Sequence, residues 1–262
     1  MRRRGQGALS LGLAVGYLGL IVMIPMAALA WAGLSQGAAS FWAAITEPET
    51  LAALQLTLAI SAIVAIVNAV MGTLIAWVLV RYRFPGRGIV DGLIDLPFAL
   101  PTIVAGLTLL AIYGPNSPFG VNIGFTRVGI AVALLLVTLP FVVRAVQPLL
   151  READLEAEQA AASLGAGPLY VFRRIIFPGI RPGILSGSGL AFARAIGEFG
   201  AVVLIAGNLP FQTKMSSVDI FGLIEQDKPD AAAAVSLTLL VISLASLALF
   251  DFLERRSARE AG

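Results

Sequence analysis

Long runs of uncharged residues dominate this chain. A helix needs roughly 20 apolar residues to cross the hydrocarbon core of a bilayer. The runs predict six membrane-spanning helices, at about residues 9–33, 53–80, 91–113, 128–149, 184–206 and 231–252. Several prolines fall inside these runs, which membrane helices tolerate where neighbouring groups satisfy the freed backbone.

The composition supports a membrane protein. Hydrophobic residues make up 58% of the chain and charged residues 13%, and the mean hydropathy is +0.89. One soluble core of this size could not hide so much apolar surface. The chain has no Cys and no His, which excludes disulfides, thiolate metal sites and imidazole chemistry, and we expect no metal and no cofactor. The expected fold class is an all-α polytopic membrane protein.

The first run resembles a secretion signal, because Arg2-Arg3-Arg4 precedes it and a small-residue stretch lies near its end. Residues 5–46 carry no charge, however, which is longer than such a signal requires. Five further spans follow. We therefore expect an uncleaved first transmembrane helix.

Basic residues predict the orientation. If the N-terminus is cytosolic, thirteen Lys and Arg residues fall on cytosolic segments, and the outer segments carry only Arg127, Lys214 and Lys228. This asymmetry places both termini in the cytosol. It also accounts for the net charge of +2, so no nucleic-acid partner is expected.

The predicted cytosolic loop at residues 150–183 differs from the other connections. Residues 152–164 have a strong helix-forming composition, Gly165 and Gly167 supply a break, and Pro168 suits the first turn of a second helix. A solvated connector is the simplest interpretation of a short charged loop. The small side chains at 159–162 instead favour a helix–turn–helix against which another protein packs closely.

This loop resembles the EAA loop of ABC importer permeases. That family pattern is Glu-Ala-Ala, three residues, Gly, nine residues, then Ile-x-Leu-Pro, and the spacing here is complete. Two letters depart from it, with Gln159 in place of Glu and Phe177 in place of Leu. The resemblance implies that the loop couples the permease to an ATPase through the matching positions, Gln159, Ala160, Ala161, Gly165, Ile175 and Pro178.

Over about residues 50–255 the chain is similar to the T-type permeases of sulfate and thiosulfate importers. The segments that carry this similarity are 95–102, 139–148, 190–200 and 207–211. Molybdate permeases share the Arg-Ala-x-Gly-Glu-Phe-Gly element at 194–200, so molybdate or tungstate transport is the alternative. The resemblance implies the six-helix ABC importer permease (MetI-like) fold, with a first helix and outer loop at 1–49, a permease core at 50–255 and a cytosolic tail at 256–262.

The resemblance also implies partners and a mechanism. These are a second, W-type permease, two cytosolic ATPase subunits and an extracytoplasmic sulfate-binding protein, in a bacterial inner membrane, with transport by alternating access. The chain is expected not to be an enzyme itself. A P-loop requires G-x-x-x-x-G-K-[ST], and neither Lys214 nor Lys228 lies in that context.

Charges inside the predicted spans are candidates for a transport role. Arg194 and Glu198 lie four residues apart, on one helix face, where they form either a cationic point on an anion pathway or an ion pair that fixes the helix. Both interpretations stay open. We expect Arg144 to reach toward the membrane surface, and Asp91 and Asp95 to cap or bound the third span.

Two other classes of protein fit less well. An ion-coupled secondary transporter could place an ion pair in mid-membrane, but it needs no loop like 150–183, and no convincing internal repeat is present. An intramembrane enzyme would require a nucleophile and a base. This chain has no His or Cys to serve as either, and both of its lysines lie in predicted outer segments.

Overall fold

The computed structural model describes residues 11–261, and most of them are helical. Within these residues five helices are long and apolar enough to cross a membrane, and a sixth, Thr102–Tyr113, is apolar but shorter. The predicted all-helical membrane architecture is confirmed, with five full-length spans and one short helix in place of six equal spans. The start of the first predicted span and Arg2-Arg3-Arg4 lie outside the described residues.

The elements follow the chain in a simple order. The first spanning helix covers Leu11–Leu34 and contains a π-helical turn. The remaining helices are α2 (Ile24–Leu34, the end of that first span), α3 (Gly37–Thr46), α4 (Pro48–Arg81), α5 (Arg87–Ile94), α6 (Leu96–Ala99), α7 (Thr102–Tyr113), α8 (Arg127–Glu152), α9 (Leu155–Ser163), α10 (Pro168–Val171), α11 (Phe177–Ile196), α12 (Gly200–Ile205), α13 (Ser216–Glu225) and α14 (Pro229–Ala261).

The third predicted span is not one helix. Residues 91–113 are divided among α5, α6 and α7, with Leu100 extended between the last two. Pro101 explains the second break, because it cannot donate a backbone hydrogen bond and it disfavours helical geometry at the residue before it. The prediction of a continuous helix over this range was wrong. The prolines within the range were the feature of the sequence that indicated a possible break in the helix.

The fifth predicted span is interrupted as well. α11 ends at Ile196, residues 197–199 leave the helix, and α12 begins at Gly200. α12 packs across α7, so the two interrupted spans meet. A side chain at Gly200 would collide with Thr102, and one at Gly106 would collide with the Ala201 backbone. Glycine at both positions allows the two helices to cross in direct contact.

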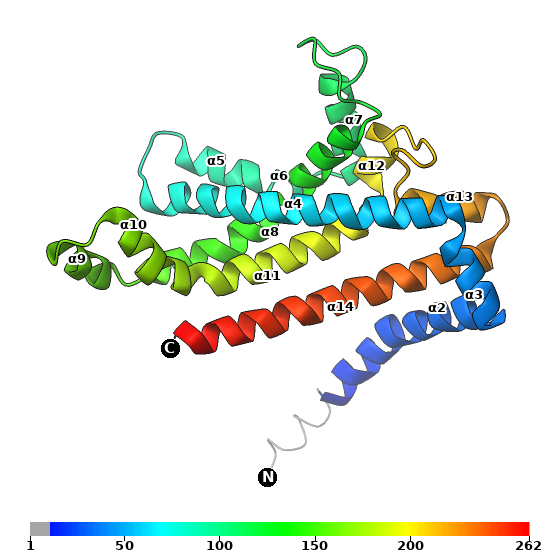
Figure 1. Cartoon of the computed structure of the whole chain (residues 1–262), viewed down its shortest axis with the longest axis horizontal. Coiled ribbons are helices and arrows are strands. Elements are labelled where there is room, and N and C mark those ends of the chain that lie inside the picture. The colour runs from blue at the N-terminus through cyan, green and yellow to red at the C-terminus, as the bar shows by residue number, and fades with distance from the viewer. Residues whose placement is uncertain (1–10, 262) are drawn as a thin grey trace.

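α4, α8 and α11 form the centre of the bundle (Figure 1). Two glycines bring α11 against α8: a Cβ at Gly183 would lie 2.7 Å from the Ala145 carbonyl oxygen, and one at Gly187 would lie 2.7 Å from the Val142 Cα. Such small residues let membrane helices approach closely. α14 packs on α11 and on the first spanning helix, which completes an outer layer.

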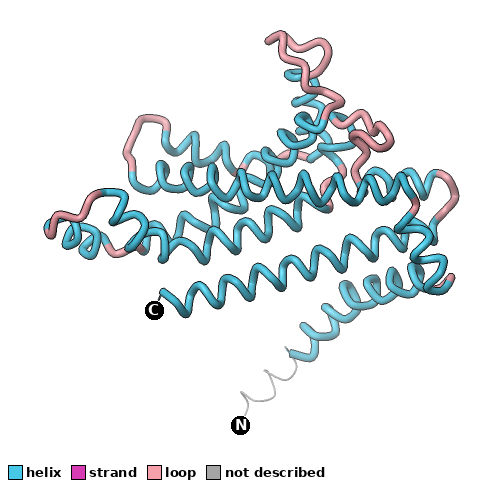
Figure 2. The backbone as a smooth tube through the Cα atoms, viewed as in Figure 1, coloured by secondary structure: helices cyan, strands magenta, loops and turns pink. Residues whose placement is uncertain are grey.

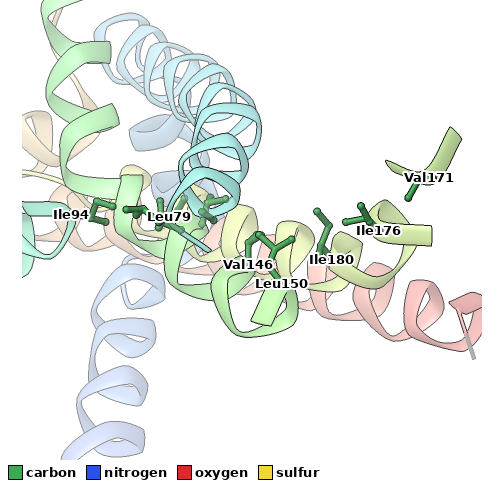
Figure 3. Close-up of a cluster of buried hydrophobic side chains, with 11 residues drawn as sticks. Leu79, Ile94, Val146, Leu150, Val171, Ile176 and Ile180 are labelled. Carbon is green, nitrogen blue, oxygen red and sulfur yellow. The ribbon is translucent and has the colours of Figure 1, made fainter. Parts of the chain in front are cut away.

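One apolar cluster extends from the bundle into the loop that follows α8. Figure 3 shows Leu79 and Ile94 at one end of this cluster, Val146 and Leu150 on α8, and the loop residues Val171 and Ile176 at the other end. The helices of the loop therefore pack against the membrane-spanning bundle. Figure 1 shows α9 and α10 at one end of the bundle, and Figure 2 shows the longer connecting loops at its edges and short non-helical breaks within it.

Candidate functional site

The loop after α8 folds as a helix, a turn and a short helix, as its sequence predicts. Asp154 caps α9, since its side chain accepts hydrogen bonds from the backbone N–H groups of Glu156 and Ala157. Gly165 follows the end of α9 with a φ of +86°. α10 then begins at Pro168 and continues through a π-helical turn, Phe172–Ile176, directly into α11.

The residues that match the family motif divide between two faces of this loop. Gln159, Ala160 and Gly165 are exposed, and Leu164 beside them is 89% exposed. Ala161 is partly buried against the apolar cluster. The outer face is thus small, smooth and partly apolar, which is the character of a surface that another protein covers.

The inner face anchors the loop. Ile175 and Pro178 are partly buried, and the intervening Ile176 is a member of the apolar cluster. Pro178 follows the π-helical turn Phe172–Ile176 within the continuous helix Pro168–Ile196, where its missing N–H removes one backbone hydrogen bond. A push on the outer face would therefore reach α11 through a packed connection.

An ion pair secures the loop to α4. Arg81, the last residue of α4, pairs with Glu158, and its guanidinium also lies 5.2 Å from the centre of the Trp77 ring. Both charged side chains are mostly buried. The carboxylate of Glu158 is therefore engaged within the chain, which leaves the neighbouring Gln159 as the polar residue on the outer face.

The predicted Arg194–Glu198 pair forms, but not on one helix face. The Arg194 Nη2 and Glu198 Oε2 atoms are 2.6 Å apart, with the arginine side chain 36% exposed and the glutamate 1% exposed. Glu198 lies in the break after α11. Its Oε1 accepts a hydrogen bond from the Ala201 N–H at 2.8 Å, and its carbonyl accepts one from the Ser217 hydroxyl at 2.7 Å. The glutamate therefore joins α11, α12 and α13 at one point.

A second charged cluster was missed at the sequence level. Arg144 donates two hydrogen bonds to the carboxylate of Asp95, at 2.7 and 2.6 Å, and one to Asp91 at 2.6 Å. Gln147 completes the cluster by accepting from Arg144 and donating to Asp91. Asp95 lies at the boundary between α5 and α6, as expected, but its side chain makes no capping hydrogen bond and binds Arg144 instead. That Arg144 reaches toward the membrane surface stays a prediction. Asp95 and Asp91 lie 49 and 53 residues before Arg144 in the chain, so no local feature of the sequence indicated that they pair with it.

This cluster should contribute measurable stability. Replacing Arg144 with Gln leaves two partly exposed carboxylates without their cation, and we expect a loss of about 2 kcal/mol. For a chain of this length that corresponds to a fall of about 5 °C in the unfolding temperature of the purified protein in detergent. Adding Asp91→Asn and Asp95→Asn removes the uncompensated charges and should restore part of the loss. Equal melting of the wild type and the single variant would contradict the role of this cluster.

The opposite end of the bundle carries its own ion-pair cluster. Lys214 pairs with Glu49 at 2.7 Å and with Asp219 at 2.9 Å, and the Thr50 hydroxyl donates to Asp219. Burial lowers the pKa of Lys214, but the hydrogen bonds to the two carboxylates outweigh this and raise it above its ordinary value. The ammonium stays charged and fastens the start of α4 to α13. Within residues 11–261 no group of three His, Cys or carboxylate side chains is placed to hold a metal ion.

This interrupted-helix bundle with an exposed helix–turn–helix is the architecture of a transport permease. Residues 68–259 match the family described as the binding-protein-dependent transport system inner membrane component, and the chain belongs to that family. It is thus a membrane permease of an ABC transport system and not an enzyme. Its transport system also includes a partner permease, an ATPase and a binding protein.

Individual relatives agree with this family. The chain is 45% identical over 252 residues to the sulfate transport system permease protein CysT of a Synechocystis species, covering 94% of this chain and 88% of that protein. It is 41% identical over 258 residues to CysT of Salmonella typhimurium, covering 96% and 93%. A crystal structure of a bacterial alginate ABC transporter with its alginate-bound periplasmic protein matches the fold with a TM-score of 0.80 at 17% identity, over 97% of this chain and 96% of that one.

Proposed function

We propose that this chain is the T-type permease of an ATP-driven importer that carries sulfate, and thiosulfate as a close analogue, into the cell. The observation that carries the proposal is its identity of 41–47% to sulfate transport permeases over at least nine-tenths of its length. The segments at 139–148 and 207–211, which resemble sulfate permeases more than molybdate permeases, favour the same substrate. Molybdate or tungstate is the alternative substrate because the element at 194–200 is common to both groups.

ATP hydrolysis by partner subunits would displace the outer face of the loop. Gln159, Ala160 and Gly165 are exposed there, whereas Ala161, Ile175 and Pro178 hold the loop to the bundle. A packed connection transmits displacement because a dense interior deforms little. Closure of the ATPases would thus move α11 against α8, and the two states of this contact would open the pathway alternately to each side.

The pathway itself would pass the break between α11 and α12. Interrupted helices at membrane depth occur where the backbone lines a cavity or is buried in protein. Arg194 is partly exposed at this break, so it offers a positive charge to an oxyanion, while Glu198 keeps the arginine in place. The alternative is that the pair serves only to join the helices. Substituting Arg194 and Glu198 together separates these two roles.

The proposed assembly follows the basic-residue asymmetry. Both termini and the loop of α9 and α10 would lie in the cytosol, against two ATPase subunits. A W-type permease would form the other half of the membrane domain, and a sulfate-binding protein would deliver the anion at the end that carries α13.

Complementation tests this proposal. The chain and its native partner subunits are expressed in a strain that lacks its own sulfate and molybdate importers, and uptake of radiolabelled sulfate is measured. We expect uptake that depends on ATP, with thiosulfate competing more strongly than molybdate. Uptake of molybdate in preference to sulfate would assign the alternative substrate. Uptake driven by an ion gradient after loss of the ATPase would show a secondary transporter.

A further inference from the structure

Three adjoining cavities form a groove along α4 and α11, beginning at the loop. The first has a volume of about 660 Å³ and is lined by Leu169, Tyr170, Arg173, Arg174 and Phe177. The second, of about 550 Å³, is lined by α4 residues from Ala69 to Trp77 together with Phe172, Phe177 and Ile184. The third, of about 470 Å³, continues between α4, α11 and the end of α14.

Shared walls join the three cavities into one groove. Phe177 lines both the first and the second, and Ala69 and Ile184 line both the second and the third. Ring contacts support the wall, since Phe172 packs edge-on against Trp77 with centroids 5.7 Å apart and lies beside Phe177 at 6.1 Å. The groove thus has one polar end and a long apolar body.

The polar end carries two arginines that are free to bind a ligand. Arg173 and Arg174 are both exposed, and neither forms an ion pair with any residue in the described part of the chain. Tyr170 adds a hydroxyl beside them. Adjacent guanidinium groups bind phosphate oxygens through charge-assisted hydrogen bonds, and basic pockets at the cytosolic edge of a membrane domain attract anionic headgroups.

We propose that this groove binds an anionic phospholipid, with its phosphate at Arg173 and Arg174 and an acyl chain along α4 and α11. A soluble oxyanion would use the arginines but not the apolar body. A helix of another subunit would fill the apolar body but would leave the two cations without a counter-charge. A phospholipid matches both parts. The inference rests on the proposed orientation, which places the arginines at the cytosolic leaflet.

The position of the arginines connects this lipid to transport. Both lie in the π-helical turn that links the loop to α11, the segment through which ATPase movement would reach the pathway. A bound headgroup would hold this turn at the membrane surface. Anionic lipid is therefore expected to stabilise the connection between loop and bundle.

Native mass spectrometry tests the site on the full chain assembled with its transport partners. The complex is reconstituted in nanodiscs of equal phosphatidylglycerol and phosphatidylcholine, and the lipid that stays bound after release is identified. We expect preferential retention of phosphatidylglycerol. The double substitution Arg173→Gln with Arg174→Gln should reduce it about 25-fold, since one basic residue near an anionic leaflet contributes a factor of about five.

Two matched controls make the result specific. The pair Arg83→Gln with Arg87→Gln removes the same charge from the α4–α5 link and the first residue of α5, and should leave retention unchanged. Ala69→Phe narrows the groove where two cavities meet and should reduce retention with both arginines intact, whereas Val67→Phe, at an exposed α4 position that lines none of these cavities, should not.

Several outcomes would overturn the proposal. Equal retention in the two arginine pairs would remove the headgroup site. Displacement of lipid by millimolar sulfate together with normal retention in Ala69→Phe would indicate a soluble-anion site. Cross-linking of position 69 to the partner permease would assign the groove to a protein interface. Because uptake is not measured, failure here leaves the proposed transport function untouched.

Discussion

Replacing Gly165 with valine is expected to reduce sulfate uptake to background while the chain still inserts and folds. Gly165 has a φ of +86°, a left-handed conformation in which a β-branched residue is strained by about 2 kcal/mol. Its N–H donates to the Ala162 carbonyl, and the next N–H donates to that of Ala161, both at 3.0 Å. Relief of the strain would rotate α9 away from α10 and displace the outer face that the ATPase meets. The measurement is uptake per assembled complex.

The surroundings of Gly165 make this a test of backbone conformation alone. Apart from Gly165 and its two neighbours in the chain, no residue has an atom within 4 Å of the position that a Cβ would occupy, so the valine side chain itself has room. Gly165→Asn should retain most uptake, because asparagine tolerates the left-handed region. Gly167→Val is the matched control, since that glycine has an ordinary φ of −70° and an equally open Cβ position. Full uptake by Gly165→Val would exclude this loop as the coupling element.

The second large effect is expected at the break between α11 and α12. Arg194→Gln alone leaves the almost fully buried carboxylate of Glu198 without its cation, which should impair assembly whether the pair serves the pathway or only the fold. Combining it with Glu198→Gln removes that charge. A glutamine at 198 can still accept the hydrogen bond from the Ala201 N–H, so the start of α12 keeps its cap.

The double variant separates the two roles of Arg194. If the arginine guides the anion, assembly should recover but uptake should stay lower by about tenfold or more, because a positive site raises the local concentration and the on-rate of an anion by that order. Radiolabelled sulfate uptake is normalised to the amount of assembled complex. Arg194→Lys keeps the charge and should retain more uptake than the double variant. Near-normal uptake by the double variant would leave the pair a structural role only.

Much of the architecture could be predicted from residues close together in the chain. The thickness of the bilayer sets the length of uncharged sequence that a spanning helix needs. The long uncharged runs therefore predicted the positions of α4, α8 and α14. The turn at Gly165 and the start of α10 at Pro168 depend on the local conformations that glycine and proline allow. The Arg194–Glu198 ion pair could also be predicted from the sequence, because two side chains only four residues apart in the chain stay close together. The family motif in the loop added the expected coupling role.

Contacts between distant segments decided the rest. Pro97 and Pro101 permitted a break in the third span, but a proline within a run does not determine whether a helix kinks, as Pro140 within α8 shows. The crossing of α7 and α12 at Gly106 and Gly200 depends on how two interrupted spans pack. The pairing of Arg144 with two aspartates joins segments about 50 residues apart. The energies of these contacts depend on the spatial arrangement of the helices, and only the tertiary structure sets that arrangement.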